Sequence, residues 1–242
     1  MASGYSSSVS GGEGNEASGM YSSVSGGIYN NASGEDSSVF GGWGNTASGE
    51  DSSVFGGWYN VASGKESSAF SGTDSVVQGH CSVGVAGGST GSSAENALAA
   101  GSNSVVTVAN GTAIGYQATT NKTGTIAFGH DKGDVSGYTV TWQQLSEGKA
   151  LIEGEAEDYN DYTKPPTITE NTYSSAYYNR LVKIADGIDA HDAVTVEQLN
   201  KAVASAGGGS GKTYTAGSDI DISSANAISV KKAGLIASGN TG

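Results

Sequence analysis

The chain has 242 residues, a formal net charge of −13 and 39 glycines, and only 14% of its residues are charged. So much glycine with so little charge excludes an ordinary globular composition. The acidic balance disfavours nucleic-acid binding, because no basic surface is available to replace backbone counterions. No apolar run approaches the ~20 residues of a membrane helix, and no signal peptide opens the chain, so a membrane anchor is expected outside this sequence.

The first part of the chain is a tandem repeat. Ala-Ser-Gly recurs every fifteen residues from Ala2 to Ala62, and a registered glycine recurs from Gly12 to Gly129 at steps of fifteen and then fourteen residues. Each block holds two short strand-like runs, separated by corners rich in Gly and Asn, which tolerate a positive φ. Copies stacked about 4.8 Å apart would pair in parallel register. Residues 1–134 are therefore predicted to form a mainly β fold, a parallel β-solenoid with one block per turn.

The predicted turn is narrow, because its interior candidates are mostly Ala, Ser and Val. Ordering the backbone of one residue costs roughly 1–2 kcal/mol, and a core this small offsets little of that cost. We therefore expect several chains to associate along the whole length of the solenoid.

Aromatic and acidic side chains recur at fixed positions of the turn. Phe40, Phe55 and Phe70 form one column, which is expected to stack within the roll or at a contact between chains. A tryptophan column follows Gly-Gly, where side chains often point outward, and adjoining acidic columns would complete a repetitive contact surface. A solvated acidic face, partly neutralised by Lys65, is the alternative for the acidic columns. The candidate contact residues are Glu35, Asp36, Trp43, Glu50, Asp51, Trp58 and Tyr59.

Two catalytic patterns lack the context that their chemistry needs. Residues 87–91 match G-x-S-x-G, but they lie in a Ser/Gly-rich corner without a following helix. Residues 206–213 approximate a P-loop, but they follow a predicted helix and precede a strand, which reverses the required order. No catalytic residue is therefore predicted, and the chain is not expected to be an enzyme.

Metal and cofactor sites are not expected either. The Gly-Gly blocks lack the Asp of calcium-binding β-rolls, and His80, His130 and His191 show no ligand spacing. A cation between stacked acidic pairs is weighed against a solvated acidic face, and the solvated face is favoured. Cys81, the single cysteine, is interpreted as a semi-buried small apolar residue rather than a reactive thiol.

The periodicity stops near residue 134. Residues 135–178 contain both prolines and many tyrosines, and the runs 135–145 and 149–160 are predicted to be strands of a small β-meander. Residues 207–242 are interpreted as a Gly-rich joint and the start of a further β module that is truncated at the end of the sequence.

Between these segments, residues 179–206 contain a predicted helix. Thr195 and Gln198 have the spacing of a capping box at its start. Val196, Leu199 and Val203 then fall at the spacing of a coiled-coil seam. The same spacing also suits an ordinary helix that packs on a core.

Several of these segments resemble the trimeric autotransporter adhesins, also called the YadA-like family. SVSGG at 8–12 and 23–27, TAIGYQATT at 112–120 and TIAFGHDKG at 125–133 are similar to the family's head repeats. GIDAHDAVTVEQL at 187–199 is similar to its neck motif. The first six blocks depart from the usual repeat of about fourteen residues, and Gly-Gly replaces the more frequent Ile-Gly or Leu-Gly. Thr195 replaces the common Asn of the neck, and both residues can cap a helix.

The resemblance implies a left-handed parallel β-roll in each chain and a homotrimer on the surface of Gram-negative bacteria. It also implies a non-enzymatic adhesin that binds host extracellular matrix or host cells, or other bacteria during autoagglutination and biofilm growth. Residues 135–178 would be an insert within the neck. A structural spacer, as in a phage tail fibre, is the alternative, and the sameness of the blocks suits it. The expected neck and helix residues of the trimer are Asp192, Ala193, Val194, Thr195, Val196, Gln198, Leu199 and Val203.

Overall fold

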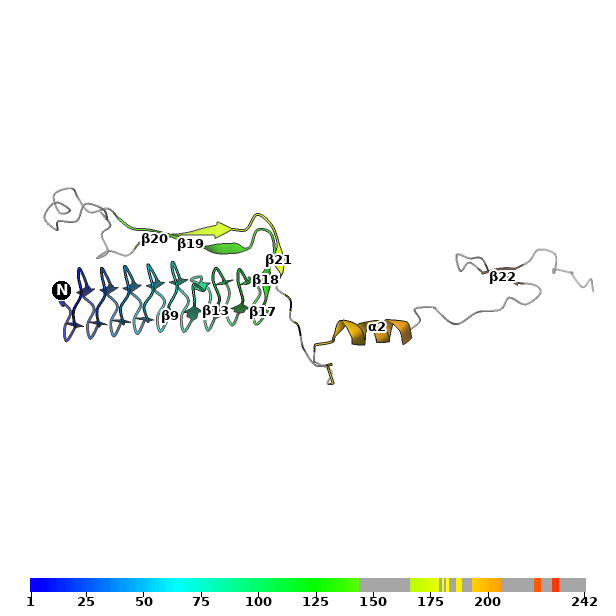
Figure 1. Ribbon diagram of the computed structural model, residues 1–242, viewed down its shortest axis with the longest axis horizontal. Coiled ribbons are helices and arrows are strands. Elements are labelled where there is room, and N and C mark those ends of the chain that lie inside the picture. Colours follow the sequence, from blue (N-terminus) through cyan, green and yellow to red (C-terminus); the bar gives the residue numbers. More distant parts are fainter. Residues whose placement is uncertain are drawn as a thin grey trace, which may run out of the picture. The chain divides into compact units, whose positions relative to one another are not determined.

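A computed structural model describes residues 1–143, 166–178, 180, 182, 186–188 and 193–205, together with the backbone of two strands at 220–222 and 228–230. The chain divides into two units, Met1–Leu181 and Val182–Gly242, and each is described by itself. The first is a parallel β-solenoid that carries a β-hairpin, and the second contains one short helix (Figure 1).

The solenoid consists of two parallel sheets, and the chain alternates between them at every half turn. The nine-stranded sheet contains β1 (Ser8–Val9), β3 (Ser23–Val24), β5 (Ser38–Val39), β7 (Ser53–Val54), β9 (Ser68–Phe70), β11 (Val83–Val85), β13 (Leu98–Ala100), β15 (Thr112–Ile114) and β17 (Ile126–Ala127). The eight-stranded sheet contains β2 (Glu16–Ala17), β4 (Asn31–Ala32), β6 (Thr46–Ala47), β8 (Val61–Ala62), β10 (Val76–Val77), β12 (Ser89–Thr90), β14 (Val105–Val106) and β16 (Thr119–Thr120).

The strand register confirms the prediction of stacked copies. Val39 pairs with Val54 fifteen residues on, and Ala99 pairs with Ala113 fourteen residues on. Between β10 and β12 the spacing is irregular, because only Val77 and Thr90 pair there. The change of repeat length seen in the sequence therefore coincides with a local break in the ladder.

The interior is as narrow as the sequence indicates. Its larger apolar cluster alternates between the two sheets and consists of alanine and valine only (Ala17, Val24, Ala32, Val39, Ala47, Val54, Ala62, Ala69 and Val77). Polar groups fill the rest of the interior, and buried serines donate to carbonyls within the corners, as Ser37 Oγ does to Gly34 O at 2.8 Å. Such a core supplies little hydrophobic stabilisation per turn.

A ladder of buried asparagines runs through the first five turns. Asn45 Nδ2 donates to Gly41 O at 2.8 Å and to Gly57 O of the next turn at 2.9 Å, while its Oδ1 accepts from Asn60 N at 2.9 Å. Asn15, Asn30 and Asn60 make the same three bonds. These asparagines are not among the residues with positive φ, and their side chains lie inside the solenoid. They bond buried backbone groups, among them amide N–H groups such as that of Asn60.

Most of the described residues with positive φ are Gly or Asn, as the sequence indicated, but acidic residues and Cys81 also adopt this conformation. Asp36, Asp51 and Cys81 have φ values of 53°, 56° and 52°. Glycine is required where the backbones of successive turns approach, since a Cβ on Gly49 would lie 2.1 Å from the carbonyl oxygen of Gly64. The tight stacking of turns, rather than the turn angle alone, therefore explains the Gly of Ala-Ser-Gly.

Residues after the solenoid form an antiparallel hairpin of β19 (Val135–Thr141) and β20 (Thr167–Thr172). Tyr138 and Trp142 pack on Val61, Val76 and Val105, which project outward from the eight-stranded sheet. The hairpin thus runs back along the solenoid and covers part of this sheet (Figure 1). The predicted strand at 135–145 agrees with β19, whereas the predicted strand at 149–160 lies outside the described residues.

A second short pairing closes the end of the solenoid. β18 (Gly129–His130) pairs antiparallel with β21 (Tyr177–Tyr178). The buried imidazole of His130 stacks on the ring of Tyr173, with centroids 3.5 Å apart. His130 therefore serves as a packed aromatic group at the start of the insert.

The second unit contains α2 (Val196–Ser205) and an antiparallel pair formed by β22 (Ile220–Ile222) and β23 (Ile228–Val230). The predicted capping box is confirmed, because Gln198 N donates to Thr195 Oγ1 at 3.1 Å and Thr195 N donates to Gln198 Oε1 at 3.0 Å. Gln198 also bonds both backbone groups of Gly187, which fastens the incoming chain to the first helical turn.

Candidate functional site

The candidate contact residues occupy two different corners of the turn. The acidic corner leads from the eight-stranded to the nine-stranded sheet and carries Glu35, Asp36, Glu50, Asp51, Lys65, Glu66, His80 and Cys81 in successive turns. The aromatic corner leads back and carries Ile28, Tyr29, Trp43, Trp58 and Tyr59. The outer face of the nine-stranded sheet lies between the two corners. Within one chain the acidic and aromatic columns are therefore separated, in contrast to the expected adjoining columns.

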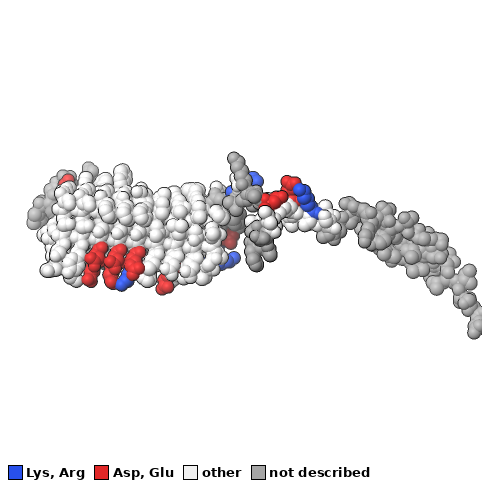
Figure 2. All heavy atoms as spheres, turned by 90° about the horizontal axis from the view of Figure 1, so that it is seen from below, with Lys and Arg blue, Asp and Glu red and all other residues white. Residues whose placement is uncertain are grey.

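The acidic corner forms a row of exposed carboxylates along one edge of the solenoid, which Figure 2 shows as a line of acidic side chains. Lys65 Nζ lies 2.7 Å from Glu50 Oε1, and both side chains are about half exposed. The hydrogen bond and charge of Glu50 raise the pKa of Lys65 above its ordinary value. Lys65 thus neutralises one carboxylate of the row, as the sequence indicated, and the carboxylates of the earlier turns remain available to solvent.

The aromatic corner forms a third ladder, in which isolated parallel bridges join Ile28 to Trp43 and Trp43 to Trp58. The two indole rings meet edge to face at 6.0 Å, and the Trp43 ring lies 5.9 Å from the Tyr59 ring. Trp58 is 57% exposed even after these contacts. Trp43 and Trp58 therefore present aromatic surface and indole N–H donors to solvent, whereas Tyr29 and Tyr59 pack against the cluster of Val61 and Trp142.

The phenylalanine column lies on the outer face of the nine-stranded sheet. Phe40, Phe55 and Phe70 stack in parallel, with centroids 4.7 and 4.3 Å apart. All three rings are exposed, and Phe40 reaches 53%. Stacking within the roll is thus confirmed, but it leaves one long edge of the ring stack uncovered. The hairpin packs on the other sheet, so the phenylalanine column stays exposed in the single chain.

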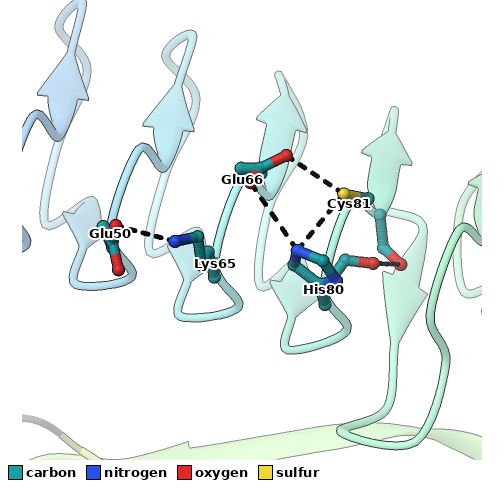
Figure 3. A network of polar contacts seen from close by, with 6 residues as sticks. Glu50, Lys65, Glu66, His80 and Cys81 are labelled. Atoms are coloured by element: carbon teal, nitrogen blue, oxygen red, sulfur yellow. Dashed lines mark hydrogen bonds and ion pairs between the residues drawn. The ribbon is translucent and has the colours of Figure 1, made fainter.

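Figure 3 shows a cluster at the acidic corner that the sequence analysis missed. Cys81 Sγ donates to Glu66 Oε2 at 3.2 Å and lies 3.4 Å from His80 Nε2, which is 3.7 Å from Glu66 Oε1. The thiol hydrogen bond lowers the pKa of Glu66 and raises that of Cys81. Cys81 is half-buried, as the sequence indicated, but its thiol belongs to a polar corner and not to an apolar one. The fifteen-residue period, which aligns Glu66 with Cys81, was the signal available in the sequence.

The G-x-S-x-G pattern has a structural explanation. Ser89 lies in β12, its side chain is buried, and its Oγ accepts a hydrogen bond from Val76 N at 3.0 Å. A nucleophile elbow needs an exposed hydroxyl at a strand-to-helix turn, and Ser89 occupies a strand inside the solenoid. The P-loop-like run at 206–213 lies outside the described residues.

The predicted seam residues of the helix are exposed in the single chain. Val196 is 74% exposed, and Leu199 and Val203 are each more than half exposed. In the described part of the second unit no side chain of α2 is buried, so the helix does not pack on a core there. Ala193 and Val194 precede the helix as extended chain, and Asp192 lies outside the described residues.

Comparison with protein-family models and with curated proteins finds no match for this chain. Among the described residues, no helix is long and apolar enough to cross a membrane.

Proposed function

We propose that the protein is a trimeric adhesin of the bacterial cell surface, in which a β-roll head presents repeated, non-enzymatic binding sites. The observation that carries this proposal is the exposed tryptophan column, in which Trp43 and Trp58 occupy the same corner of successive turns. Repetition multiplies weak contacts through effective concentration, so no deep pocket is required. Host extracellular matrix, host cell surfaces and other bacterial cells are the proposed ligands.

Exposed apolar surface supports the trimeric part of the proposal. The stacked phenylalanines and the seam formed by Val196, Leu199 and Val203 are uncovered in one chain. A helix of about ten residues is marginal in isolation, and an exposed aromatic ladder favours association. We assign the phenylalanine face and the helix seam to contacts between chains, in a left-handed roll followed by a trimeric neck.

The aromatic corner is then the better candidate for ligand contact. Trp and Tyr are enriched where proteins bind partners, because they supply large apolar area together with polar groups. The acidic corner, at the other edge, would attract basic patches on a ligand and weaken with salt. The two columns thus act as independent candidate surfaces.

The mass of the untagged chain in solution tests the architecture first. A trimer is expected by analytical ultracentrifugation, and replacing Phe55 with Asp should shift the mass toward the monomer, because it places a charge within the ring stack. A parent chain that sediments as a stable monomer would overturn the trimeric proposal, whatever the chain binds.

Binding of the parent trimer to immobilised matrix proteins and to host cells tests the adhesive part. Trp43→Ser combined with Trp58→Ser should reduce binding several-fold while leaving the mass unchanged. A matched double variant at the other corner, Asp36→Asn with Asp51→Asn, reports on the acidic column. Full binding by both folded trimers would contradict the assignment of these two columns as contact surfaces.

A structural spacer is the second candidate, and the near-identity of the turns favours it. In a spacer the repeats set length, while other modules bind. Removing one complete fifteen-residue turn, such as 32–46, separates the two functions. Binding should fall stepwise if turns carry sites, whereas a spacer loses reach without losing affinity.

A further inference from the structure

Three side chains of different chemistry converge at the acidic corner, in the turns that follow its exposed carboxylates. Glu66 lies in one turn, and His80 and Cys81 lie at the same corner of the next (Figure 3). Their ligand atoms, a carboxylate oxygen, an imidazole nitrogen and a thiol sulfur, all lie within 4.8 Å of one another. Among the described residues, this is the one group of three such side chains that meets this criterion.

The separations among the three side chains are close to those between the ligands of a tetrahedral zinc site. Zinc binds Cys at about 2.3 Å and His or Glu at about 2.0–2.2 Å, so ligand atoms at tetrahedral angles lie about 3.3–3.6 Å apart. The observed separations are 3.2 Å from Cys81 Sγ to Glu66 Oε2, 3.4 Å from Cys81 Sγ to His80 Nε2 and 3.7 Å from His80 Nε2 to Glu66 Oε1. The sulfur and the nitrogen thus contact different carboxylate oxygens, and rotation of the Glu66 carboxylate would bring one oxygen toward both.

The backbone around the cluster is fixed by the solenoid ladder. Glu66 N donates to Glu50 O at 2.8 Å, and Cys81 N donates to Lys65 O at 3.0 Å. The second bond joins the two turns of the cluster, and the first joins the turn of Glu66 to the turn before it. The spacing of the three ligands is therefore a property of the fold, and a metal would find them already placed.

We propose that Glu66, His80 and Cys81 form a zinc site that joins two turns of the solenoid. A thiolate, a neutral imidazole and a carboxylate are all ligands that zinc accepts, whereas calcium requires six to eight oxygen ligands. The fourth position takes water or the carboxylate of Glu95, which occupies the position of His80 one turn further on.

Binding proceeds by exchange of a proton for the metal. The thiol of Cys81, which donates to Glu66 in the free protein, releases its proton to solvent as the sulfur–zinc bond forms. No redox change occurs, and zinc stays divalent. The bound metal is expected to stabilise the solenoid next to the irregular pairing of β10 and β12, because it binds the folded turns and not the separated ones.

Zinc and cobalt titrations of the reduced, untagged, chelator-treated chain test the proposal. We expect one Zn²⁺ per chain by competition with a chromophoric chelator, and a higher thermal midpoint in its presence. Co²⁺ should produce a thiolate charge-transfer band and the intense visible bands of a tetrahedral site. Because changes outside the ligand set commonly cost roughly 10- to 100-fold in metal affinity, loss of a ligand should cost at least about 100-fold.

Ligand variants and a matched control separate this site from general attraction of cations to the acidic edge. Cys81→Ser should abolish the charge-transfer band, and His80→Asn and Glu66→Gln should weaken zinc binding by the same large factor. Asp51→Asn, which removes one charge at the position of Glu66 in the preceding turn, should bind as the parent does. Absence of stoichiometric zinc binding by the parent, or parent-like binding by a folded Cys81→Ser chain, overturns the proposal.

Discussion

The asparagine ladder makes the stability of the solenoid depend on single side chains. Asn45 is fully buried, with 0% of its surface exposed, and it makes three hydrogen bonds. Replacing Asn45 with Ala removes two donors to Gly41 O and Gly57 O, and it removes the acceptor for Asn60 N. Gly57 O retains its bond from Trp43 N, whereas Asn60 N–H loses its side-chain acceptor.

The magnitude follows from these three groups. Each net hydrogen bond contributes about 0.5–1.5 kcal/mol, and a buried donor left without a partner costs about 1–3 kcal/mol. Two lost carbonyl bonds and one orphaned amide therefore predict that Asn45→Ala lowers the free energy of unfolding by about 2–6 kcal/mol. Asn45→Asp keeps the acceptor for Asn60 but directs oxygen at two carbonyls, so we expect a loss at least as large, and a smaller one at acid pH, where the protonated acid can donate.

Urea denaturation followed by far-ultraviolet circular dichroism measures the effect at fixed chain concentration. The midpoint should fall and the slope should stay constant, since a change of slope would indicate that turns unfold separately. Asn110→Asp is the control, because Asn110 is exposed at a corner with φ of 55°. It should stay within about 0.5 kcal/mol of the parent. A loss below about 1 kcal/mol for Asn45→Ala would refute the assignment of the ladder as a main source of stability.

Other predictions concern the hairpin, the corners and the helix. Tyr138 carries a buried hydroxyl without a partner among the described residues, so Tyr138→Phe should leave stability unchanged in urea denaturation or raise it by up to about 1 kcal/mol, and a large loss would contradict this. Burial raises the pKa of Tyr138 well above 10.0 and that of Tyr173 to about 12. The folded chain therefore keeps phenol protons that the unfolded chain releases. The stability that this provides is present below pH 10 and falls as the pH rises toward 12, and the fall should be smaller in Tyr138→Phe. Circular dichroism together with tyrosinate absorbance measures this loss of stability. Gly49→Ala should cost about 1–3 kcal/mol or more through its clash with the next turn, whereas Gly11→Ala, where a Cβ meets nothing within 4 Å, should be silent in the same denaturation assay. Gln198→Ala should reduce the helical circular-dichroism signal, with a loss of about 1 kcal/mol for the capping interaction, and an unchanged signal would argue against the cap.

The stacking of the solenoid was predictable, because residues that are one repeat apart in the sequence become neighbours in space. A residue and its copy fifteen positions on must lie one rung apart, so the register of Val39 with Val54 followed from alignment of the blocks alone. The capping box was predictable for a similar reason, since its two members, Thr195 and Gln198, are only three positions apart in the sequence. Local and periodic contacts are both encoded within short stretches of chain.

The hairpin was not predictable in the same way. β19 was found from its alternation, but its partner β20 begins 26 residues after it ends, and only the antiparallel pairing identifies that partner. That the hairpin lies on the eight-stranded sheet depends on Trp142 and Tyr138 meeting Val61, Val76 and Val105. No period relates these residues, so their contact could not be inferred from spacing.

The asparagines and Cys81 show how the period can be used further. Residue type alone indicated corner formers and a small half-buried group, whereas the repeat positions of these residues carried more information. Asn recurring at an unbroken fifteen-residue step indicates a side chain that bonds from turn to turn, because an exposed corner would tolerate variation among copies. Glu66 and Cys81 also occupy one column, because they are fifteen residues apart in the sequence. In a solenoid, the residues of a site can therefore be found by comparing equivalent positions of the aligned repeats, because residues that are distant in sequence become neighbours there.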